Sequence, residues 1–421
     1  MTTVDRILFL SWESPWPALR GGQLRTVGLL RELSRFFKVD AIVISELPLT
    51  EKQVAELERY AQQIIPVPML RVALNDRMQI LTLMLRYRMP FHCAILHHSF
   101  RHAPATLHKI HAFPGIVYAS YGHWGTLVRG RYAPNWILDQ TDENIQFWRV
   151  YASQTSRPAK KIAALINWRL AAAHFPRIYA DVGRIISVCE EDRQLTLAVA
   201  PRSQVDVVEN GVDCSHFIPN RERQLEPQRM LFTGTSAPRN MTALHRFVRD
   251  VLPLIQAQKP DVELLVAGNF SVEAQTAFDG VANIHFTGLV EDMRPAFNQS
   301  DVFVAPFTET HGSKLKVAEA MAMAMPIVST PQGIRGFSLT DGESVLIAHN
   351  NKQFAAQVIH LLNDNQTRES LGTAARRLAL ATIEWSVLGE RLRRIVDKHN
   401  AWLLDLSREK RRDGQPKTFA K

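Results

Sequence analysis

Short apolar runs separated by amphipathic stretches recur along the whole chain, and this alternation restricts the fold more than any other feature of the sequence. In the first half, the runs of strand length are RILFLSW, KVDAIVIS, GIVYASYG, NWILDQTD, RIISVC and VDVVENGVD. The second half repeats the pattern with MLFTGT, VELLVAGNF, NIHFTGL, DVFVAPF, PIVST and SVLIA. Strands that alternate with helices form parallel, doubly wound sheets. The sequence therefore predicts an α/β protein with two Rossmann-like domains.

A charged segment, NRERQLEPQR, separates the two halves of the chain. We expect an N-terminal domain over residues 1–218 and a C-terminal domain over residues 229–383. A helix over residues 384–405 is expected to cross back to the first domain, and residues 406–421 form a basic tail that is predicted to be disordered. Helices are also expected over Gly22–Phe37, Glu51–Gln63 and Pro158–Ala180.

Composition limits the class of protein. The chain has 421 residues and 46% apolar content, which is typical of a globular protein with two to three domains. No apolar run reaches the length of a membrane span, and the N-terminus does not resemble a signal peptide. The three cysteines are far apart and match no metal-binding spacing. We therefore expect a cytoplasmic protein without a bound metal or other cofactor.

The formal net charge is +9, and the basic residues are concentrated in three regions. The tail SREKRRDGQPKTFAK carries six basic and two acidic residues, and residues 66–110 and 151–180 are also rich in Lys and Arg. These regions could contact an anionic membrane surface, which would make the protein peripheral at the inner face of the cell membrane. They could equally form a solvated basic face with a disordered tail. Nucleic acid is not expected as a partner, because no nucleic-acid-binding motif accompanies the charge.

The segment HGSKLKVAEAMAMAMPIVST is the strongest candidate for a binding site. On a helix that begins near Ser313, Gly312, Lys316 and Glu319 fall on one stripe. The start of such a helix offers backbone amides and a positive dipole for an anion, with Lys314 adding charge. The carboxylate of Glu319 could bind hydroxyl groups, although an ordinary surface ion pair has the same spacing. Because apolar strands flank the helix, the site should lie at the carboxyl edge of a sheet.

Weaker candidates follow other predicted strands. Gly21 and Gly22 lie at the start of the first helix, and Asn210 follows the last strand of the first half. Gly234, Thr235 and Ser236 end the first strand of the second half and could hold a phosphate. Asp139 and Asp142 end a strand of the first half, where either could act on a substrate or cap the following helix.

These segments together resemble the GT-B glycosyltransferases, specifically the retaining family 4 enzymes (glycosyl transferases group 1). The resemblance covers nearly the whole chain and rests mainly on HGSKLKVAEAMAMAMPIVST and ENGVD. It implies two Rossmann-like domains that face each other across a cleft. It also implies a donor site for a nucleotide diphosphate sugar on the second domain, with Glu319 on the ribose and Lys314 or Lys316 on the leaving diphosphate.

The chain departs from the family pattern at several positions. The family usually carries two glutamates seven residues apart, and His311 occupies the first of these positions here. The loop TGTSAPRN resembles an alternative found in a subgroup of the family. The usual catalytic histidine of the first domain has no clear counterpart, so Asp139 or Asp142 is the expected replacement, with His123 as another possibility.

The resemblance implies that the protein is a retaining hexosyltransferase that needs no metal ion. Its donor would be a nucleotide diphosphate sugar and its acceptor a glycan or a lipid-linked glycan, as in polysaccharide biosynthesis. The expected catalytic residues are His311, Lys316, Asp139 and Asp142, and the expected donor-binding residues include Gly312 and Ser313. Two alternatives stay open: a scaffold that binds nucleotide sugar without turnover, and a nucleotide-sugar epimerase on the same fold.

Overall fold

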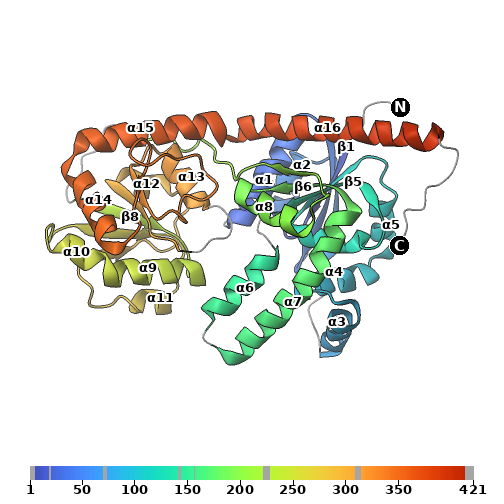
Figure 1. The fold of residues 1–421 in the computed structure, drawn as a ribbon, viewed down its shortest axis with the longest axis horizontal. Coiled ribbons are helices and arrows are strands. Elements are labelled where there is room, and N and C mark those ends of the chain that lie inside the picture. Colours follow the sequence, from blue (N-terminus) through green and yellow to red (C-terminus); the bar gives the residue numbers. More distant parts are fainter. Residues whose placement is uncertain are drawn as a thin grey trace. The chain divides into compact units, whose positions relative to one another are not determined.

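The chain folds into two compact units (Figure 1). The computed structural model describes residues 5–18, 20–69, 74–140, 144–155, 157–220, 228–308 and 314–412. Unit 1 comprises residues 1–208 and 388–421, and unit 2 comprises residues 209–387. Each unit is built on a parallel β-sheet with the strand order of a doubly wound fold. The predicted α/β architecture with two Rossmann-like domains is confirmed.

Unit 1 contains a seven-stranded sheet in the order β3-β2-β1-β4-β5-β6-β7. Its strands are β1 (Arg6–Ser11), β2 (Lys38–Ser45), β3 (Gln63–Pro68), β4 (Ile116–Ser120), β5 (Ala133–Gln140), β6 (Val182–Ser187) and β7 (Val205–Val207). Its helices are α1 (Gly21–Ser34), α2 (Glu51–Glu58), α3 (Leu74–Tyr87), α4 (Phe91–Arg101), α5 (Pro104–His111), α6 (Asn144–Gln154), α7 (Pro158–Asp181), α8 (Glu190–Val199) and the short 3₁₀ helix η1 (Gly122–Val128).

Strand β3 was missing from the sequence-based prediction, which placed a helix as far as Gln63. The helix ends at Glu58, and the chain then forms the strand QIIPVP. Proline cannot donate to a strand ladder and is tolerated at the edge of a sheet. Pro66 and Pro68 can therefore occupy β3, because β3 pairs with β2 alone and is an edge strand.

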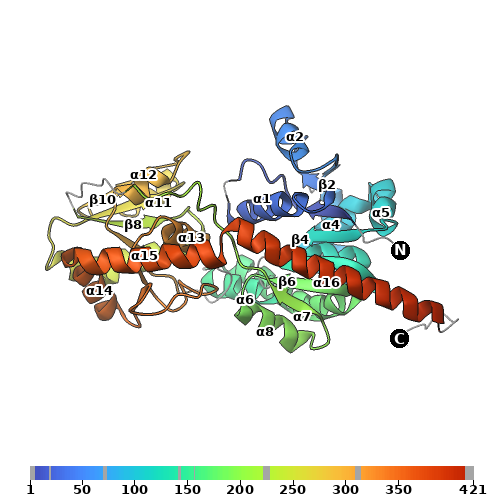
Figure 2. The same cartoon turned by 90° about the horizontal axis from the view of Figure 1, so that it is seen from above.

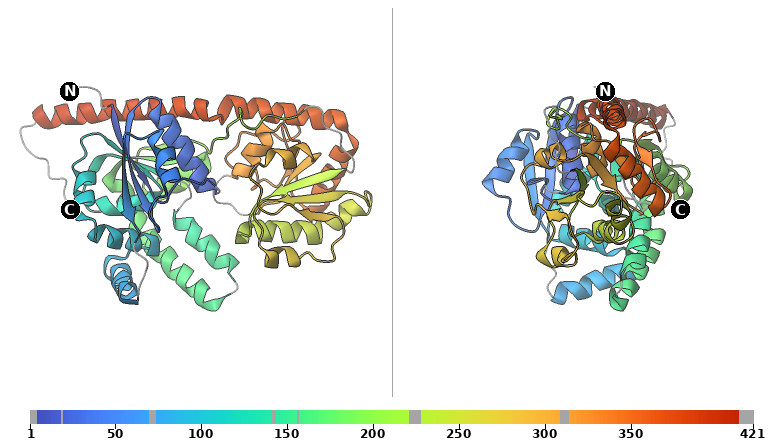
Figure 3. Two further views of the ribbon diagram at one scale, coloured as in Figure 1. Left: turned by 180° about the vertical axis from the view of Figure 1, so that it is seen from behind. Right: turned by 90° about the vertical axis from the view of Figure 1, so that its left-hand side faces the viewer.

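Along each strand of the unit 1 sheet, successive side chains point to opposite faces of the sheet. Leu8 and Leu10 share one apolar core with residues of α3, α4, α5 and α7. On the other face, β6 presents Arg184, whose Nε lies 3.5 Å from Nδ1 of His399 in the long C-terminal helix α16 (Trp385–Arg412). Gly389 of α16 packs directly against Glu32 of α1. Figures 2 and 3 show helix α16 passing close to α1. Helices thus cover both faces.

Unit 2 contains a six-stranded sheet in the order β10-β9-β8-β11-β12-β13. Its strands are β8 (Arg229–Thr233), β9 (Glu263–Ala267), β10 (Ile284–Phe286), β11 (Val302–Ala305), β12 (Ile327–Ser329) and β13 (Leu346–Ile347). Its helices are α9 (Pro238–Asp250), α10 (Leu252–Gln256), α11 (Val272–Thr276), α12 (Arg294–Asn298), α13 (Leu315–Ala322), α14 (Asn351–Asn363) and α15 (Asn365–Thr382). Leu244 and Val248 of α9 enter the core, as the helical period predicts.

Unit 2 begins at Glu209, earlier in the chain than the predicted boundary at residue 218. Hydrogen bonds from two backbone amides connect the segment after β7 to the end of unit 2. The amide of Val212 donates to the carbonyl of Ile383 (2.9 Å), and the amide of Cys214 donates to the Glu384 carboxylate (2.7 Å). Gly211 packs against the ring of Trp385, where no larger residue would fit. These contacts join residues that lie far apart in the sequence.

The strand order reverses once in each sheet, and ligands of doubly wound folds bind where it does. In unit 1 the reversal lies between β1 and β4, and in unit 2 it lies between β8 and β11. The loops that leave these four strands at their carboxyl ends are therefore the first places to look for a site. They include most of the residues that the sequence singles out.

Candidate functional site

In unit 2, the switch point brings together the β8–α9 loop and helix α13. Lys316 on α13 donates to Oδ1 of Asn240 on α9, with an Nζ–Oδ1 distance of 2.7 Å. The Lys316 ammonium also lies 4.7 Å from the ring centroid of Phe307, which follows β11. These contacts hold the charged group in place, because a cation is attracted to the face of an aromatic ring. Lys316 is thus a positioned cation at the carboxyl edge of the sheet.

Asn240 was absent from the predicted site residues. Besides accepting from Lys316, its side-chain amide donates to the backbone oxygen of Thr235 (3.1 Å). It therefore links the β8–α9 loop to α13. The segment TGTSAPRN, which Asn240 ends, was among those singled out in the sequence. The contact itself could not be predicted, because its partner Lys316 lies 76 positions further along the chain.

Glu319 lies one helical turn after Lys316 and is partly buried. Burial raises the pKa of its carboxyl group from 4.5 to about 7, although the positive charge of Lys316 acts in the opposite direction. Among the residues that the structure describes, none donates a hydrogen bond to this carboxylate. A partly buried acid without such a donor is costly to ionise. A ligand with hydroxyl groups would supply the missing hydrogen bonds.

Helix α13 starts at Leu315, two residues later than the predicted start near Ser313, with Lys314 at the N-cap. Lys314 is buried, with 3% of its surface exposed, so its stem packs inside the protein. The predicted site residues His311, Gly312 and Ser313 lie outside the described residues.

The predicted phosphate loop of Gly234, Thr235 and Ser236 follows β8 directly. Its polar groups make several contacts within unit 2: the Gly234 amide donates to the carbonyl of Ala267 (2.9 Å), and the Ser236 hydroxyl accepts from the Ser271 amide (2.7 Å). The loop is therefore held in one conformation beside Asn240 and Lys316. The structure brings these residues together with Glu319 at one edge of unit 2.

In unit 1, Gly21 and Gly22 form the first residues of α1, after β1. A side chain at Gly22 would overlap the hydroxyl of Tyr121, which follows β4. Tyr121 has a φ of 75°, a backbone conformation that side-chain-bearing residues rarely adopt. Gly22 is thus required for close packing at the switch point of unit 1.

An aromatic cluster adjoins this position and was not recognised in the sequence. The ring of Trp12, directly after β1, lies 4.0 Å from the imidazole of His123, and Tyr121 stacks on the same imidazole at 5.5 Å. His92 and Trp148 complete the cluster, with ring centroids 5.4 Å apart. These residues come from four separate segments, so no spacing in the sequence joins them.

His123 is 6% exposed, and its Nε2 is buried without a hydrogen-bond partner among the described residues. Burial lowers its pKa well below 6.5, and the neighbouring His92 adds to this effect. The imidazole is therefore neutral at physiological pH. A buried nitrogen without a hydrogen-bond partner is uncommon in native proteins, and a bound ligand could supply the partner.

Asp139 lies apart from this cluster in an interior ion pair. Its Oδ2 accepts a hydrogen bond from Nε of Arg25 on α1 (2.8 Å), and its Oδ1 accepts one from Nη2 of the same arginine (2.5 Å). Both side chains are at most 1% exposed. Asp142, the other acid proposed for catalysis, lies outside the described residues. Asn210 is buried just after β7, at the start of unit 2.

The described part of the chain has neither a metal-type cluster of side chains nor a helix that could span a membrane. No cluster of three or more His, Cys, Asp or Glu side chains there has a metal-binding arrangement. Likewise, none of its helices is both long enough and apolar enough to cross a bilayer.

Comparison with known proteins relates unit 2 to sugar transferases. Residues 227–364, which include the loop after β8, Lys316 and Glu319, match the family described as glycosyl transferases group 1. A Klebsiella pneumoniae protein, the "uncharacterized 44.6 kDa protein in cps region", is 24% identical over 371 residues, or 84% of this chain and 90% of that protein.

Two further relatives are mannosyltransferases. The phosphatidyl-myo-inositol mannosyltransferase of Mycobacterium tuberculosis is 28% identical over 230 residues, which cover 51% of this chain and 59% of that protein. A Corynebacterium glutamicum GDP-mannose-dependent mannosyltransferase, which acts on a monoacylated phosphatidylinositol monomannoside, is 27% identical over 208 residues. Those residues are 44% of this chain and 54% of the enzyme. The chain thus spans little more than half of either mannosyltransferase.

Solved structures match nearly the whole chain. Sucrose-phosphate synthase from Thermosynechococcus elongatus has a TM-score of 0.68 at 15% identity, covering 94% of this chain and 99% of its own. Anabaena HepE, solved with UDP and glucose, has a TM-score of 0.62 at 12% identity, covering 94% of this chain and 100% of its own. At such identities the likeness shows the fold, which is the GT-B fold. Together with the group 1 match, it supports a glycosyltransferase.

Proposed function

We propose that the protein transfers a sugar from a nucleotide diphosphate sugar to a glycan or a lipid-linked glycan, with retention of the anomeric configuration. The donor would bind at the carboxyl edge of unit 2. Two relatives support this class of donor, since HepE was solved with UDP-glucose and the corynebacterial enzyme is named as GDP-mannose-dependent. In this proposal the protein acts as a hexosyltransferase in polysaccharide or glycolipid assembly.

The observation that carries the proposal is the state of Glu319. Its carboxyl group is partly buried, its pKa is raised to about 7, and no described residue donates a hydrogen bond to it. An ionised carboxylate accepts hydrogen bonds and donates none, so the two hydroxyls of a ribose suit it. Binding of the nucleotide would then supply hydrogen bonds that no described residue gives to this carboxylate. A carboxyl group with a raised pKa beside a positioned cation is a common feature of ligand sites.

Lys316 is proposed to stabilise the charge that develops on the leaving diphosphate. Its ammonium is already held by Asn240 and by the ring of Phe307, so little reorganisation is needed during the reaction. A fixed cation at this position can replace a divalent metal ion, and we propose that transfer is metal-independent. The hydroxyls of Thr235 and Ser236 lie in the loop beside Asn240, where they could orient the phosphates.

The acceptor is proposed to bind at the aromatic cluster of unit 1. Apolar faces of sugar rings pack on aromatic side chains, and Trp12, Tyr121 and Trp148 provide such faces. The neutral imidazole of His123 could hydrogen-bond an acceptor hydroxyl through its buried Nε2. This assignment favours His123 over Asp139 as the polar group of unit 1 that contacts substrate, because Arg25 occupies both oxygens of Asp139.

We also propose that the protein works in the cytoplasm at the inner face of the cell membrane. This setting is supported by the net charge of +9 and by the lipid-linked substrates in the names of the mannosyltransferase relatives.

The direct test is a thermal-shift series with UDP, GDP, ADP, CMP and dTDP on the wild-type protein, Glu319→Ala and a matched surface variant, Glu343→Ala. A nucleotide at a hundred times its dissociation constant stabilises a protein by about 2.7 kcal/mol. We expect one nucleotide to stabilise wild type and Glu343→Ala but not Glu319→Ala. Equal stabilisation of all three proteins would refute the assignment of the donor site.

Measurements of turnover distinguish the proposed transferase from a scaffold and from an epimerase. A transferase releases nucleotide from the matching nucleotide sugar faster when an acceptor is added. A scaffold would bind the nucleotide sugar and leave it intact, and an epimerase would convert the sugar without any acceptor. Retention of configuration is checked by the anomeric signals of the product in an NMR spectrum.

A further inference from the structure

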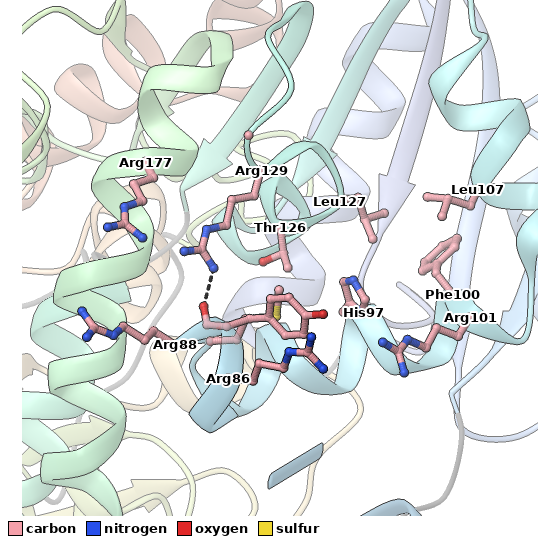
Figure 4. Close-up of a pocket in the computed structure, with 13 residues that line it drawn as sticks. Arg86, Arg88, His97, Phe100, Arg101, Leu107, Thr126, Leu127, Arg129 and Arg177 are labelled. Carbon is pink, nitrogen blue, oxygen red and sulfur yellow. Dashed lines mark hydrogen bonds between the residues drawn. The ribbon is translucent and has the colours of Figure 1, made fainter. Parts of the chain in front are cut away.

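A cavity of about 610 Å³ in unit 1 is lined by five arginines and no acidic residue. They are Arg86, Arg88, Arg101, Arg129 and Arg177. Figure 4 shows these side chains around the cavity, from the end of α3 and the α3–α4 turn, from α4, from the segment after η1 and from α7. None of the residues assigned to the donor or the acceptor lines it.

Little within the described residues neutralises this charge. Arg129 donates to the backbone oxygen of Tyr87 (2.5 Å) and lies near Asp181, whose carboxylate accepts from the Gly130 amide (2.6 Å). No described carboxylate forms an ion pair with Arg86, Arg88, Arg101 or Arg177. Like charges held together raise the free energy of the protein, and a bound anion would relieve that repulsion.

The positive charge of the arginines contributes to lowered pKa values at two neighbouring histidines. Burial, together with the charges of Arg129 and Arg177, lowers the pKa of His174 to about 3. Burial and the charge of Arg101 lower the pKa of His97, which lines the cavity and whose Nδ1 is buried without a partner among the described residues. Both imidazoles are therefore neutral, and His97 adds a hydrogen-bonding group to the cavity lining without adding charge.

An exposed apolar stripe adjoins the cavity on helix α3. Met78, Leu81 and Leu85 fall on one face of the helix and are 65%, 46% and 68% exposed. On the inner face, Ile80 and Leu83 are buried in the core of unit 1. An exposed apolar stripe with arginines beside it suits a helix that lies in a membrane interface.

We propose that the arginine cavity binds a phosphate group, and that this group belongs to an anionic phospholipid whose acyl region lies against the α3 stripe. Guanidinium groups match phosphate oxygens with two hydrogen bonds each, and five of them suit a phosphomonoester or a diphosphate better than a singly charged group. The same chemistry would accept a soluble phosphate compound, but the apolar stripe favours a lipid. The inference does not depend on the proposed transfer reaction.

The test uses the full chain and vesicles of phosphatidylcholine with or without 20% phosphatidic acid. We compare wild type, Arg88→Ser/Arg177→Ser, and a control, Lys52→Ser/Arg202→Ser, which removes two exposed charges of unit 1 outside the cavity. Each basic residue near an anionic surface contributes about 1 kcal/mol, so the cavity variant should bind phosphatidic acid vesicles about 30-fold more weakly than wild type. The control should lose clearly less.

Inorganic pyrophosphate and Leu81→Ser/Leu85→Ser distinguish a lipid source from a soluble one. With a lipid ligand, the leucine variant loses vesicle binding while pyrophosphate still raises its melting temperature. If pyrophosphate stabilises the protein through the cavity arginines but vesicles do not bind, the ligand is soluble and the lipid assignment is wrong.

Two results would overturn the cavity proposal as a whole: equal losses in the cavity variant and its control, or equal binding to vesicles without phosphatidic acid. Nucleotide stabilisation of the cavity variant is measured in parallel. It should match wild type, because the donor residues belong to unit 2, and this separates failure of the cavity proposal from failure of the proposed function.

Discussion

At the scale of single residues, Glu319 links ligand binding to the pH dependence of stability. Its folded-state pKa is raised from 4.5 to about 7, so the folded protein favours the protonated acid. The resulting stability is fully present below about pH 4.5 and is lost as the pH rises through about 7. Glutamine resembles the protonated acid at every pH.

We therefore predict that Glu319→Gln stabilises the unliganded protein at pH 8.5 and has little effect at pH 4.5. The gain should be about 1–3 kcal/mol, since one pKa unit corresponds to about 1.4 kcal/mol and the group is partly solvated. Urea unfolding at both pH values measures it, with Glu343→Gln as the control. The same variant should bind nucleotide more weakly at pH 8.5. A variant that gains no stability at high pH would show that the Glu319 carboxyl is not perturbed.

Lys316 and Asn240 give a second prediction at this scale. Lys316→Ala should lower kcat about a hundredfold, because it removes a positioned charge from the leaving group, while nucleotide affinity changes by a few-fold. Asn240→Ala should lower kcat less, since the lysine remains but loses the acceptor at 2.7 Å. Asn240→Asp, which keeps an acceptor, should retain more activity than Asn240→Ala. Steady-state kinetics and nucleotide titrations measure both quantities, and Lys352→Ala on the exposed start of α14 is the control.

At the scale of elements, a buried ion pair between Arg25 and Asp139 connects helix α1 to strand β5. Removing one partner of a buried ion pair leaves an uncompensated charge and typically costs about 3–5 kcal/mol. We predict that Asp139→Asn lowers the stability of unit 1 by an amount in this range. In Arg25→Met/Asp139→Leu, where neither charge remains, stability should be closer to wild type than in either single variant.

Urea unfolding followed by fluorescence measures these differences. Turnover, measured on the same variants beside their stability, decides whether Asp139 is catalytic, as the sequence suggested. A catalytic Asp139 would lose turnover on substitution while stability stayed near wild type, which is the reverse of the outcome predicted from its ion pair.

At the scale of the whole molecule, the two units have separate apolar cores. Of the eight tryptophans in the sequence, only Trp385 falls in unit 2. Tryptophan fluorescence therefore reports mainly on unit 1, whereas far-ultraviolet circular dichroism reports on helices of both units.

We predict that the stabilising nucleotide shifts part of the dichroism transition to higher urea and leaves the fluorescence transition nearly unchanged. A ligand stabilises the body that binds it, and the donor residues lie in unit 2. Equal shifts in both signals would mean either that the two units unfold together or that unit 1 contributes to nucleotide binding.

Sequence patterns predicted what depends on local periodicity. Alternating short strands and amphipathic helices specified two doubly wound units, and helical spacing placed Lys316 and Glu319 on one stripe. Strand β3 was not predicted, because its two prolines are unfavourable in most strands. They are tolerated here because β3 lies at the edge of the sheet. The boundary near residue 218 shifted because Val212 and Cys214 bond to residues 383 and 384.

The sequence by itself determined the class of fold and the edge of each sheet where a ligand site is expected, because both follow from the order and period of apolar residues. Tertiary structure alone decided which side chains meet. Asn240 accepts a hydrogen bond from Lys316, Arg25 forms an ion pair with Asp139, and five arginines from separate segments line one cavity. Such contacts join elements many residues apart, and their distances are set by how whole helices pack on a sheet, which no local pattern encodes.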